Sequence, residues 1–327
     1  MNILFIGSGA VGSYFAGKLS QTGAAVSLQA RSDYEHVKIH GVHIHSVDGD
    51  FHYQPRHVVR DAAELPAKPD YAVLCIKVVE GADRVALLKN AVGPDTAIVL
   101  LSNGIEIEPE IAQAYPDHEI ISALAFIGVT RTAPGHVHHQ AYGHLSLGSY
   151  PSGLSDKARW LSEAFQSAGV LCNADADIAT ARWQKCVWNA AFNPVSVLTG
   201  LDTGRILNGQ EGLIRALMQE VVAIAAAVGH PLPDTLVDKS IHGTKKMAAY
   251  KTSMLVDLEA GQPLETEVIL GNAVRAGHKA GVPIPHLETV YALLKLKEAQ
   301  RDRCSEVMSV SNQNAGNRLH TPFRPGA

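Results

Sequence analysis

The sequence is poor in cysteine and in long apolar runs. Its four cysteines, in a chain of 327 residues, are widely scattered, a spacing that gives neither a disulfide framework nor a zinc site. A reducing cytoplasm is therefore the compartment that we expect. No uninterrupted apolar stretch reaches the ~18 residues that a membrane helix needs, so we expect no membrane partner.

A basic excess is also lacking. Lys and Arg together number 28 and Asp and Glu number 32, which gives a net charge of −4. A protein that binds the backbone of a nucleic acid carries a basic excess or a basic stripe, so we expect no nucleic-acid partner. Histidines alternate at His43 and His45, but no cysteine or carboxylate set completes a metal site beside them, and we predict no metal.

Length and composition are those of a globular protein with two domains. Apolar residues make up 46% of the chain and charged residues 18%, which supports packed cores and argues against general disorder. At roughly 150 residues per domain, the length predicts about two domains. We place an NADP-binding domain at residues 1–174, a helical substrate and catalytic domain at 175–308, and a mobile polar tail at 309–327.

A glycine-rich loop near the N-terminus lies between a predicted strand and a predicted helix. Residues 2–6 are apolar, the loop G-S-G-A-V-G follows, and a helical pattern and a second strand at 24–29 complete a β–α–β unit. In this context the glycines permit a tight turn, a close approach of backbone to a pyrophosphate, and close helix packing. The pyrophosphate then meets free N–H groups at the helix N-terminus. We predict a Rossmann-type domain whose cofactor contacts are Gly7, Ser8, Gly9, Ala10, Val11 and Gly12.

The end of the second predicted strand bears on the choice of cofactor. NAD-binding units place an acid there for the ribose 2′-hydroxyl, whereas this chain has Ala30-Arg31-Ser32. The guanidinium of Arg31 could clamp a 2′-phosphate through a bidentate pair, so we expect NADP(H). A solvated surface arginine is the alternative, and the nearby Asp33 keeps NAD open.

Further strand patterns extend the predicted parallel sheet. Residues 71–76 are apolar and end at Lys77, and residues 97–101 are apolar and end at Ser102-Asn103-Gly104. Ligands of doubly wound sheets bind outside the carboxyl ends of the strands, so Lys77 and Asn103 are predicted to line the cofactor cleft. Another strand is predicted at 120–127. Alternation over 136–147 predicts an antiparallel hairpin that turns at Gly143.

Helical patterns dominate beyond about residue 174. The chain is therefore predicted to be α/β, with a doubly wound parallel sheet followed by a mainly α-helical C-terminal domain. The apolar face of residues 213–228 could pair in a homodimer or pack in the domain's own core. The predicted helices cover residues 178–195, 211–228, 234–249, 265–280 and 286–299.

One predicted helix carries a polar stripe on an otherwise apolar surface. Lys185, Asn189 and Asn193 recur at intervals of four residues, which places them along one face. A polar stripe on a buried helix must reach water or line a site. We interpret it as a lysine that gives a proton and two amides that grip a substrate, with a solvated stripe as the alternative. Pro194 is predicted to kink or end this helix.

A second polar cluster lies between Ser253 and Glu267. From the local pattern alone, Ser253 is interpreted as the N-cap of a helix rather than as a ligand. Glu265 and Glu267 begin another predicted helix, where acidic side chains suit the helix dipole.

These motifs together resemble the ketopantoate reductase (2-dehydropantoate 2-reductase) family, over roughly residues 1 to 300. The resemblance implies a nucleotide-binding domain followed by a helical domain, with the active site in the cleft between them. The motifs that carry it are G-S-G-A-V-G at 7–12, Ser102-Asn103-Gly104, W-x-K-x-x-x-N-x-x-x-N-P at 183–194 and S-M-L-x-D-L-x-A-G-x-x-x-E-T-E at 253–267.

The resemblance also implies an activity and residue roles. It implies NADPH-dependent reduction of 2-dehydropantoate, a small 2-keto acid, to pantoate on the route to pantothenate and coenzyme A. The implied general acid is Lys185. The implied substrate contacts are Asn103, Asn189, Asn193, Ser253 and Glu265. The implied cofactor contacts beyond the glycine loop are Arg31, Lys77, Asn103, Gly128 and Glu265.

One position departs from the family pattern. Three residues before Ser253 the family has an asparagine, whereas this chain has Tyr250. A related reductase of another 2-keto or β-hydroxy acid therefore stays open as an alternative. A non-enzymatic NADPH sensor is a further alternative, although a sensor has no need of a proton donor such as Lys185.

Overall fold

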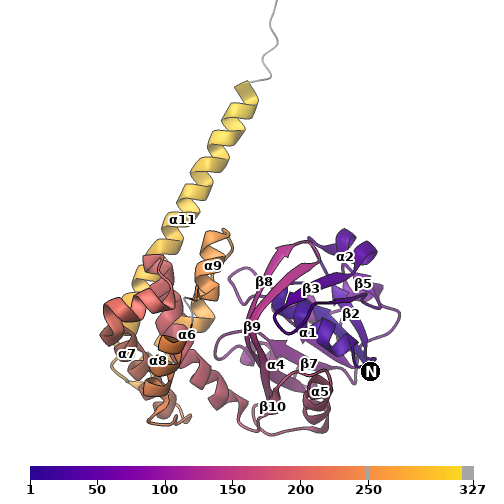
Figure 1. The fold of residues 1–327 in the computed structure, drawn as a ribbon, viewed down its shortest axis with the longest axis horizontal. Coiled ribbons are helices and arrows are strands. Elements are labelled where there is room, and N and C mark those ends of the chain that lie inside the picture. Colours follow the sequence, from indigo (N-terminus) through magenta and orange to yellow (C-terminus); the bar gives the residue numbers. More distant parts are fainter. Residues whose placement is uncertain (248–249, 319–327) are drawn as a thin grey trace, which may run out of the picture.

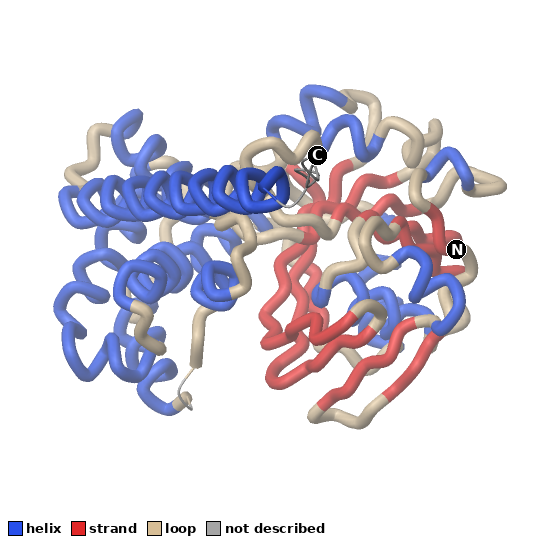
Figure 2. Tube along the Cα trace, turned by 90° about the horizontal axis from the view of Figure 1, so that it is seen from above, coloured by secondary structure: helices blue, strands red, loops and turns tan. Residues whose placement is uncertain are grey.

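The structure, a computed structural model, describes residues 1–247 and 250–318. The N-terminal half forms a lobe built on a sheet, and the C-terminal half forms a lobe of helices beside it (Figure 1). Figure 2 shows the same division from a second direction, with strands confined to one lobe. This arrangement confirms the predicted fold class, an α/β domain followed by a helical one.

A mixed sheet of ten strands, counted over the described residues, forms the core of the first lobe. Its strand order is β4-β3-β9-β8-β7-β6-β1-β2-β5, with β10 paired to β9. The run from β8 to β5 is parallel throughout, as predicted. The strands are β1 (Asn2–Ile6), β2 (Ala25–Gln29), β3 (Val42–Ser46), β4 (Phe51–Tyr53), β5 (Val58–Val59), β6 (Tyr71–Leu74), β7 (Ala97–Leu101), β8 (Ile120–Ala133), β9 (His136–Tyr150) and β10 (Cys172–Ala174).

Both faces of the sheet are covered, which explains why the central strands β6 and β7 are buried at every position. In β1, Ile3 and Phe5 enter one core with residues of α1, while Leu4 and Ile6 enter the other. This second core continues into the helical lobe, so the two lobes share packed side chains. The helices and helical turns of the first lobe are α1 (Ala10–Ser20), α2 (Tyr34–His40), η1 (Ala62–Glu64), α3 (Arg84–Leu88), α4 (Pro109–Ala114) and α5 (Asp156–Ser167).

The hairpin that we predicted within residues 136–147 is wrong. Strand β9 runs without a break and pairs antiparallel with β8, so the chain reverses before His136. Gly143 lies at a bulge instead, between Tyr142, which pairs with Ile127, and His144, which pairs with Phe126. Its φ of +112° suits a bulge as well as a turn, which is why the sequence pattern did not distinguish the two.

The second lobe contains every helix that the sequence pattern predicted, with different limits. Helix α7 begins earlier than predicted and has non-helical backbone angles at Gln210. Helix α11 continues past residue 309, where we placed the start of the tail; residues 319–327 lie outside the described residues, so the tail's mobility stays a prediction. The elements are α6 (Ile178–Thr199), α7 (Thr203–Ala227), α8 (Leu236–Lys246), α9 (Ser253–Glu259), a π-helical turn η2 (Glu267–Gly271), α10 (Asn272–Ala280) and α11 (Pro285–Arg318).

Helix α6 does not end beside Asn193, as we had allowed. It continues through Pro194 to Thr199 and is capped by Gly200, which adopts the left-handed conformation. A proline inside a helix costs about 3 kcal/mol. Phe192 and Val197 on either side are buried, and each such side chain contributes roughly 1.5–3 kcal/mol. Packing therefore outweighs the lost hydrogen bond.

Arg182 ties α6 to the sheet. Its buried guanidinium donates from Nε to Ser122 Oγ at 2.7 Å and also pairs with Glu108. Its two remaining nitrogens donate to four backbone carbonyl oxygens at the ends of β7 and β8, those of Leu100, Ser102, Gly104 and Ala123. All three nitrogens of a buried cation are thus paired, which is the condition for such a group to be tolerated.

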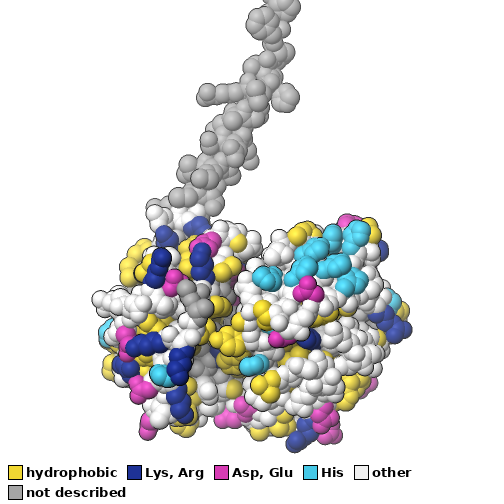
Figure 3. Space-filling view, in the orientation of Figure 1, with side chains coloured by type: hydrophobic (Ala, Val, Ile, Leu, Met, Phe, Trp, Pro, Cys, Tyr) yellow, Lys and Arg dark blue, Asp and Glu magenta, His cyan; other side chains and the backbone are white. Residues whose placement is uncertain are grey.

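Histidines gather on the face of the sheet formed by β3, β4 and β9 (Figure 3). The ring of His43 lies 4.3 Å from that of His52 and 5.0 Å from that of His136, between ring centroids. Within the described part of the chain, no group of three or more ligating side chains is arranged to hold a metal ion. In the same residues, no helix combines the length and the apolar character that crossing a membrane requires.

The Arg182 contacts predict a large effect on stability. Arg182→Met should lower the free energy of unfolding by about 3–5 kcal/mol, because it leaves the carboxylate of Glu108 buried without its partner. Urea denaturation followed by circular dichroism measures this loss. Arg159→Met, at an exposed arginine of α5, is the matched control. A loss below about 1 kcal/mol would contradict the assigned role of Arg182.

Candidate active site

The ammonium group of Lys185 lies at the carboxyl edge of the sheet. Its Nζ donates to Asn103 Oδ1 at 2.8 Å and to the carbonyl oxygen of Ala125 at 2.6 Å. The same nitrogen lies 5.1 Å from the centroid of the Phe126 ring. Lys185 therefore projects from the helical lobe toward the sheet lobe, and the stripe on α6 does not simply face solvent.

The surroundings of Lys185 shift its titration toward neutrality. Burial and, to a smaller extent, the nearby cation Arg182 lower the pKa of Lys185 to about 8, although Glu265 opposes the shift. A general acid works best when its pKa lies near the operating pH. Lys185 is thus mostly protonated near neutral pH and yet gives up its proton more readily than an exposed lysine.

Asn103 connects Lys185 to Glu265. Its Nδ2 donates to Glu265 Oε2 at 3.0 Å, while its Oδ1 accepts from Lys185. The other oxygen of Glu265 accepts from the backbone N–H of Val78 at 3.1 Å. Burial raises the pKa of Glu265, although these hydrogen bonds oppose the shift. Three predicted site residues therefore form one row of hydrogen bonds.

Lys77 reaches across to the helical lobe. Its Nζ lies 2.5 Å from Asp257 Oδ1 on α9. Burial raises the pKa of Asp257, while the contact with Lys77 opposes that shift. Asp257 belongs to the 253–267 motif, but the sequence pattern gave it no role. Its partner, Lys77, follows strand β6 and is distant in the chain, so no local pattern could indicate the contact.

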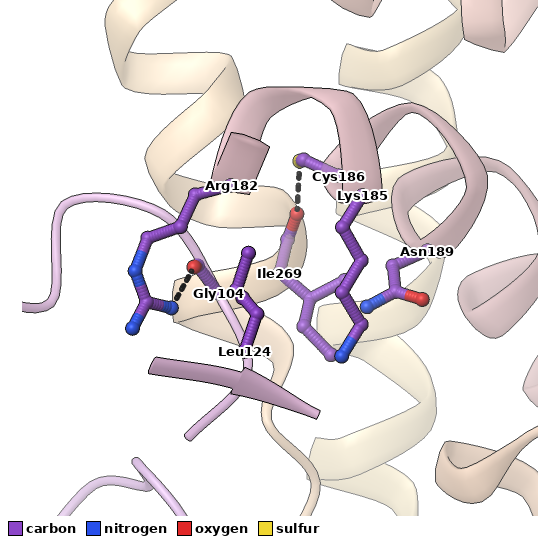
Figure 4. Close-up of a pocket in the computed structure, with 7 residues that line it drawn as sticks. All are labelled: Gly104, Leu124, Arg182, Lys185, Cys186, Asn189 and Ile269. Atoms are coloured by element: carbon purple, nitrogen blue, oxygen red, sulfur yellow. Dashed lines mark hydrogen bonds between the residues drawn. The ribbon is translucent and has the colours of Figure 1, made fainter. Parts of the chain in front are cut away.

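The two asparagines of the stripe lie deeper in α6. Asn189 and Lys185 line a cavity of about 10 Å³, which is room for about one water molecule. Asn193 is 1% exposed, and neither its Oδ1 nor its Nδ2 has a hydrogen-bond partner within the described residues. Figure 4 shows the residues that line the cavity: Gly104, Leu124, Arg182, Lys185, Cys186, Asn189 and Ile269.

The N-cap that we assigned to Ser253 is wrong. Thr252 caps α9, because its Oγ1 accepts from the backbone N–H of Leu255 at 3.2 Å. Ser253 is the first residue of the helix and is exposed. Four residues before Asp257, it lies on the face of α9 that turns toward Lys77. Its hydroxyl has no hydrogen-bond partner among the described residues, and a role in substrate binding stays a prediction.

The glycine loop has the geometry that a pyrophosphate requires. Gly7 has a φ of +111°, and a Cβ on Gly12 would meet the carbonyl oxygen of Gly7 at 2.4 Å. A Cβ on Gly9, by contrast, would meet nothing within 4 Å, so the backbone there is open to a ligand. Gly9 also caps α1 without any side-chain acceptor, which leaves N–H groups at the helix N-terminus for an anion. These residues fit a dinucleotide.

The remaining predicted cofactor contacts are less constrained by their neighbours. Arg31 is exposed just after β2, and its side chain has no partner within the described residues. Gly128 lies on β8, where a Cβ would come no nearer than 3.5 Å to Ala141. Their roles stay predictions.

The fold and this site define a two-domain oxidoreductase that acts on CH–OH groups and depends on a pyridine nucleotide. Models for the ketopantoate reductase PanE/ApbA family and for its C-terminal domain match residues 3–152 and 177–298. The chain therefore belongs to the ketopantoate reductase family, which sets aside the non-enzymatic sensor.

Individual relatives agree over nearly the whole chain. A 2-dehydropantoate 2-reductase from Nostoc sp. is 33% identical over 302 residues, covering 90% of this chain and 94% of that protein. The crystal structure of a 2-dehydropantoate 2-reductase from Methylococcus capsulatus is 63% identical with a TM-score of 0.89, covering 92% and 98% of the two chains. That from Geobacter metallireducens is 31% identical with a TM-score of 0.86, covering 90% and 99%.

The site predicts a pH dependence. Ketone reduction that needs protonated Lys185 should proceed fully below the pKa of about 8 and decline as the pH rises through it. Because Glu265 raises this pKa, Glu265→Gln should move the decline to lower pH. The single amide oxygen of the glutamine can accept from only one of the two donors, Asn103 Nδ2 or the backbone N–H of Val78. The pH profile of kcat measures the shift, with the exposed Glu163→Gln as control. An unshifted profile would mean that Glu265 exerts no charge effect on Lys185.

Proposed function

We propose that the chain reduces 2-dehydropantoate to pantoate with NADPH, a step on the route to pantothenate and coenzyme A. The observation that carries this proposal is the placement of the Lys185 ammonium. An ammonium has three N–H donors, and two of them are used by Asn103 and Ala125. The third is free for the oxygen of a ketone.

The residues around Lys185 account for the proton-transfer half of the reaction. A bound reduced nicotinamide would supply the hydride to the ketone carbon. As negative charge develops on the ketone oxygen, the free N–H of Lys185 stabilises it and then delivers a proton. Such general acid catalysis is typically worth 10²- to 10⁴-fold, and the ammonium adds electrostatic stabilisation of the oxyanion. Asn103 and Ala125 hold Nζ in place.

The polar residues further along α6 and on α9 suit the carboxylate of the substrate. Asn189, Asn193 and Ser253 offer neutral donors, so they orient a carboxylate without cancelling the charge of Lys185. Asn193 supports this role most directly, because a buried amide without partners is costly and a ligand carboxylate would give it one.

A second candidate substrate is a 2-keto acid with a larger apolar group. Phe126 and Tyr142, on β8 and β9, are 41% and 51% exposed, and Phe126 lies next to the Lys185 ammonium. On the helical lobe, the ring of Tyr250 lies 6.3 Å from that of Trp188, between centroids. Tyr250 takes the place of an asparagine in the family pattern, so this aromatic surface favours a less polar substrate end.

Replacing the proposed acid should abolish turnover and spare cofactor binding. Lys185→Met should lower kcat with 2-dehydropantoate by about 10²- to 10⁴-fold, because it removes the proposed proton donor. Single-turnover oxidation of NADPH gives the rate, and fluorescence titration gives the affinity for NADPH. Lys239→Met, at an exposed lysine of α8, is the control. Near-wild-type kcat in Lys185→Met would refute the assignment.

A panel of 2-keto acids should separate the two candidate substrates. We expect the highest kcat/KM for 2-dehydropantoate, and we expect Tyr250→Asn to raise it relative to that for a phenyl-substituted 2-keto acid, because the change replaces an apolar surface by an amide. A wild-type preference for the phenyl-substituted acid would favour the second candidate and overturn the first.

A further inference from the structure

A buried ion pair lies at the end of β2, where the sequence left the choice between NAD and NADP open. Asp33 is 2% exposed, and its Oδ1 pairs with Nη1 of Arg131, which comes from the far end of β8. The same Oδ1 accepts from Ser32 Oγ at 2.9 Å, and Oδ2 accepts from the backbone N–H of Gly135 at 3.4 Å. Both oxygens of the carboxylate are therefore occupied.

These contacts remove Asp33 from the role that an acid plays in an NAD site. A carboxylate that holds a ribose 2′-hydroxyl must present a free oxygen to it, and Asp33 has neither exposure nor a free oxygen. Its negative charge would also repel a 2′-phosphate, but the guanidinium of Arg131 lies against it and balances that charge. The pair therefore disfavours NAD and removes an obstacle to NADP.

Arg131 keeps donors to spare. The described hydrogen bonds of its guanidinium use only Nη1, which reaches Asp33 and, at 3.2 Å, Ser32 Oγ. Its side chain is 43% exposed, and Nε and Nη2 donate to no group among the described residues. Arg31 precedes Ser32 directly and is exposed without a partner. The guanidinium group of Arg131 therefore contacts the loop that carries Arg31. Guanidinium groups bind phosphate bidentately.

We propose that Arg131 is a second specificity residue for the 2′-phosphate of the cofactor, acting beside Arg31. It does so in two ways: it occupies Asp33, and it presents its unused N–H donors to the phosphate. The inference rests on the proposed function for the identity of the cofactor, NADPH. It concerns the adenosine end of that cofactor, however, and not the keto acid.

The test compares two nucleotide fragments that differ only by the 2′-phosphate. Isothermal titration calorimetry of the full chain measures the affinities for adenosine 2′,5′-bisphosphate and for AMP. The wild type should prefer the bisphosphate. In Arg131→Gln that preference should fall by about 10- to 100-fold, because the phosphate loses a charged hydrogen-bond donor and the carboxylate of Asp33 loses its cationic partner. AMP affinity should change little.

Two further variants separate specificity from a structural role. Asp33→Asn combined with Arg131→Gln should regain part of the preference, because the bared carboxylate is gone. Arg131→Lys keeps a charge beside Asp33 and should retain part of the preference, which keeps the test decisive if the glutamine variant folds poorly. Arg159→Gln is the surface control. Equal loss of both ligands, or an unchanged preference in Arg131→Gln, would overturn the proposal.

Fragment binding requires no keto acid and no turnover. If the substrate panel fails while the bisphosphate preference depends on Arg131, the proposed substrate falls and this inference stands. If the wild type shows no preference for the bisphosphate, both this inference and the choice of NADPH fall, whatever the panel gives.

Discussion

The guanidinium of Arg182 is the contact on which the active site depends. It inserts from α6 between the ends of β7 and β8 and satisfies four carbonyl oxygens, Ser122 and Glu108 together. Lys185 follows three residues later on the same helix and is therefore its neighbour on the helix surface. Fixing Arg182 fixes the axial position and rotation of α6, and with them the point at which the Lys185 ammonium meets the sheet.

Charge is distributed around Lys185 so that its proton stays available. Direct contact with a carboxylate would favour the charged lysine and occupy its donors. Here the carboxylate of Glu265 is separated from Lys185 by the neutral amide of Asn103. Glu265 therefore partly offsets the lowering of the Lys185 pKa by burial, without accepting a hydrogen bond from the ammonium group. In the proposed substrate site, the neutral asparagines Asn189 and Asn193 likewise leave the charge of Lys185 uncancelled.

Local patterns predicted the parts of the site whose chemistry lies within one segment. The glycine loop and the stripe of Lys185, Asn189 and Asn193 are of this kind, because each is recognised from the spacing of residues within one short segment. Residues whose roles depend on distant partners were missed. The sequence pattern gave Arg182 no role. It gave Asp257 and Asp33 no partner, since Lys77 and Arg131 lie far away in sequence. The predictions at Gly143 and Pro194 were wrong because a glycine suits a bulge as well as a turn, and a proline can lie inside a helix as well as at its end.

Strand β8 contacts both Lys185 and Asp33, which lie at the two ends of the proposed site. The carbonyl of Ala125 holds Lys185, and Arg131, six residues further along the same strand, holds Asp33 at the end of β2. At ~3.3 Å per residue the two points lie about 20 Å apart along the strand, a separation suited to the two ends of an extended dinucleotide. Under the two proposals, a single strand sets both the position of the proton donor and the charge beside the cofactor's 2′-phosphate. A shift in the register of β8 would disturb both together, and its long antiparallel pairing with β9 opposes such a shift.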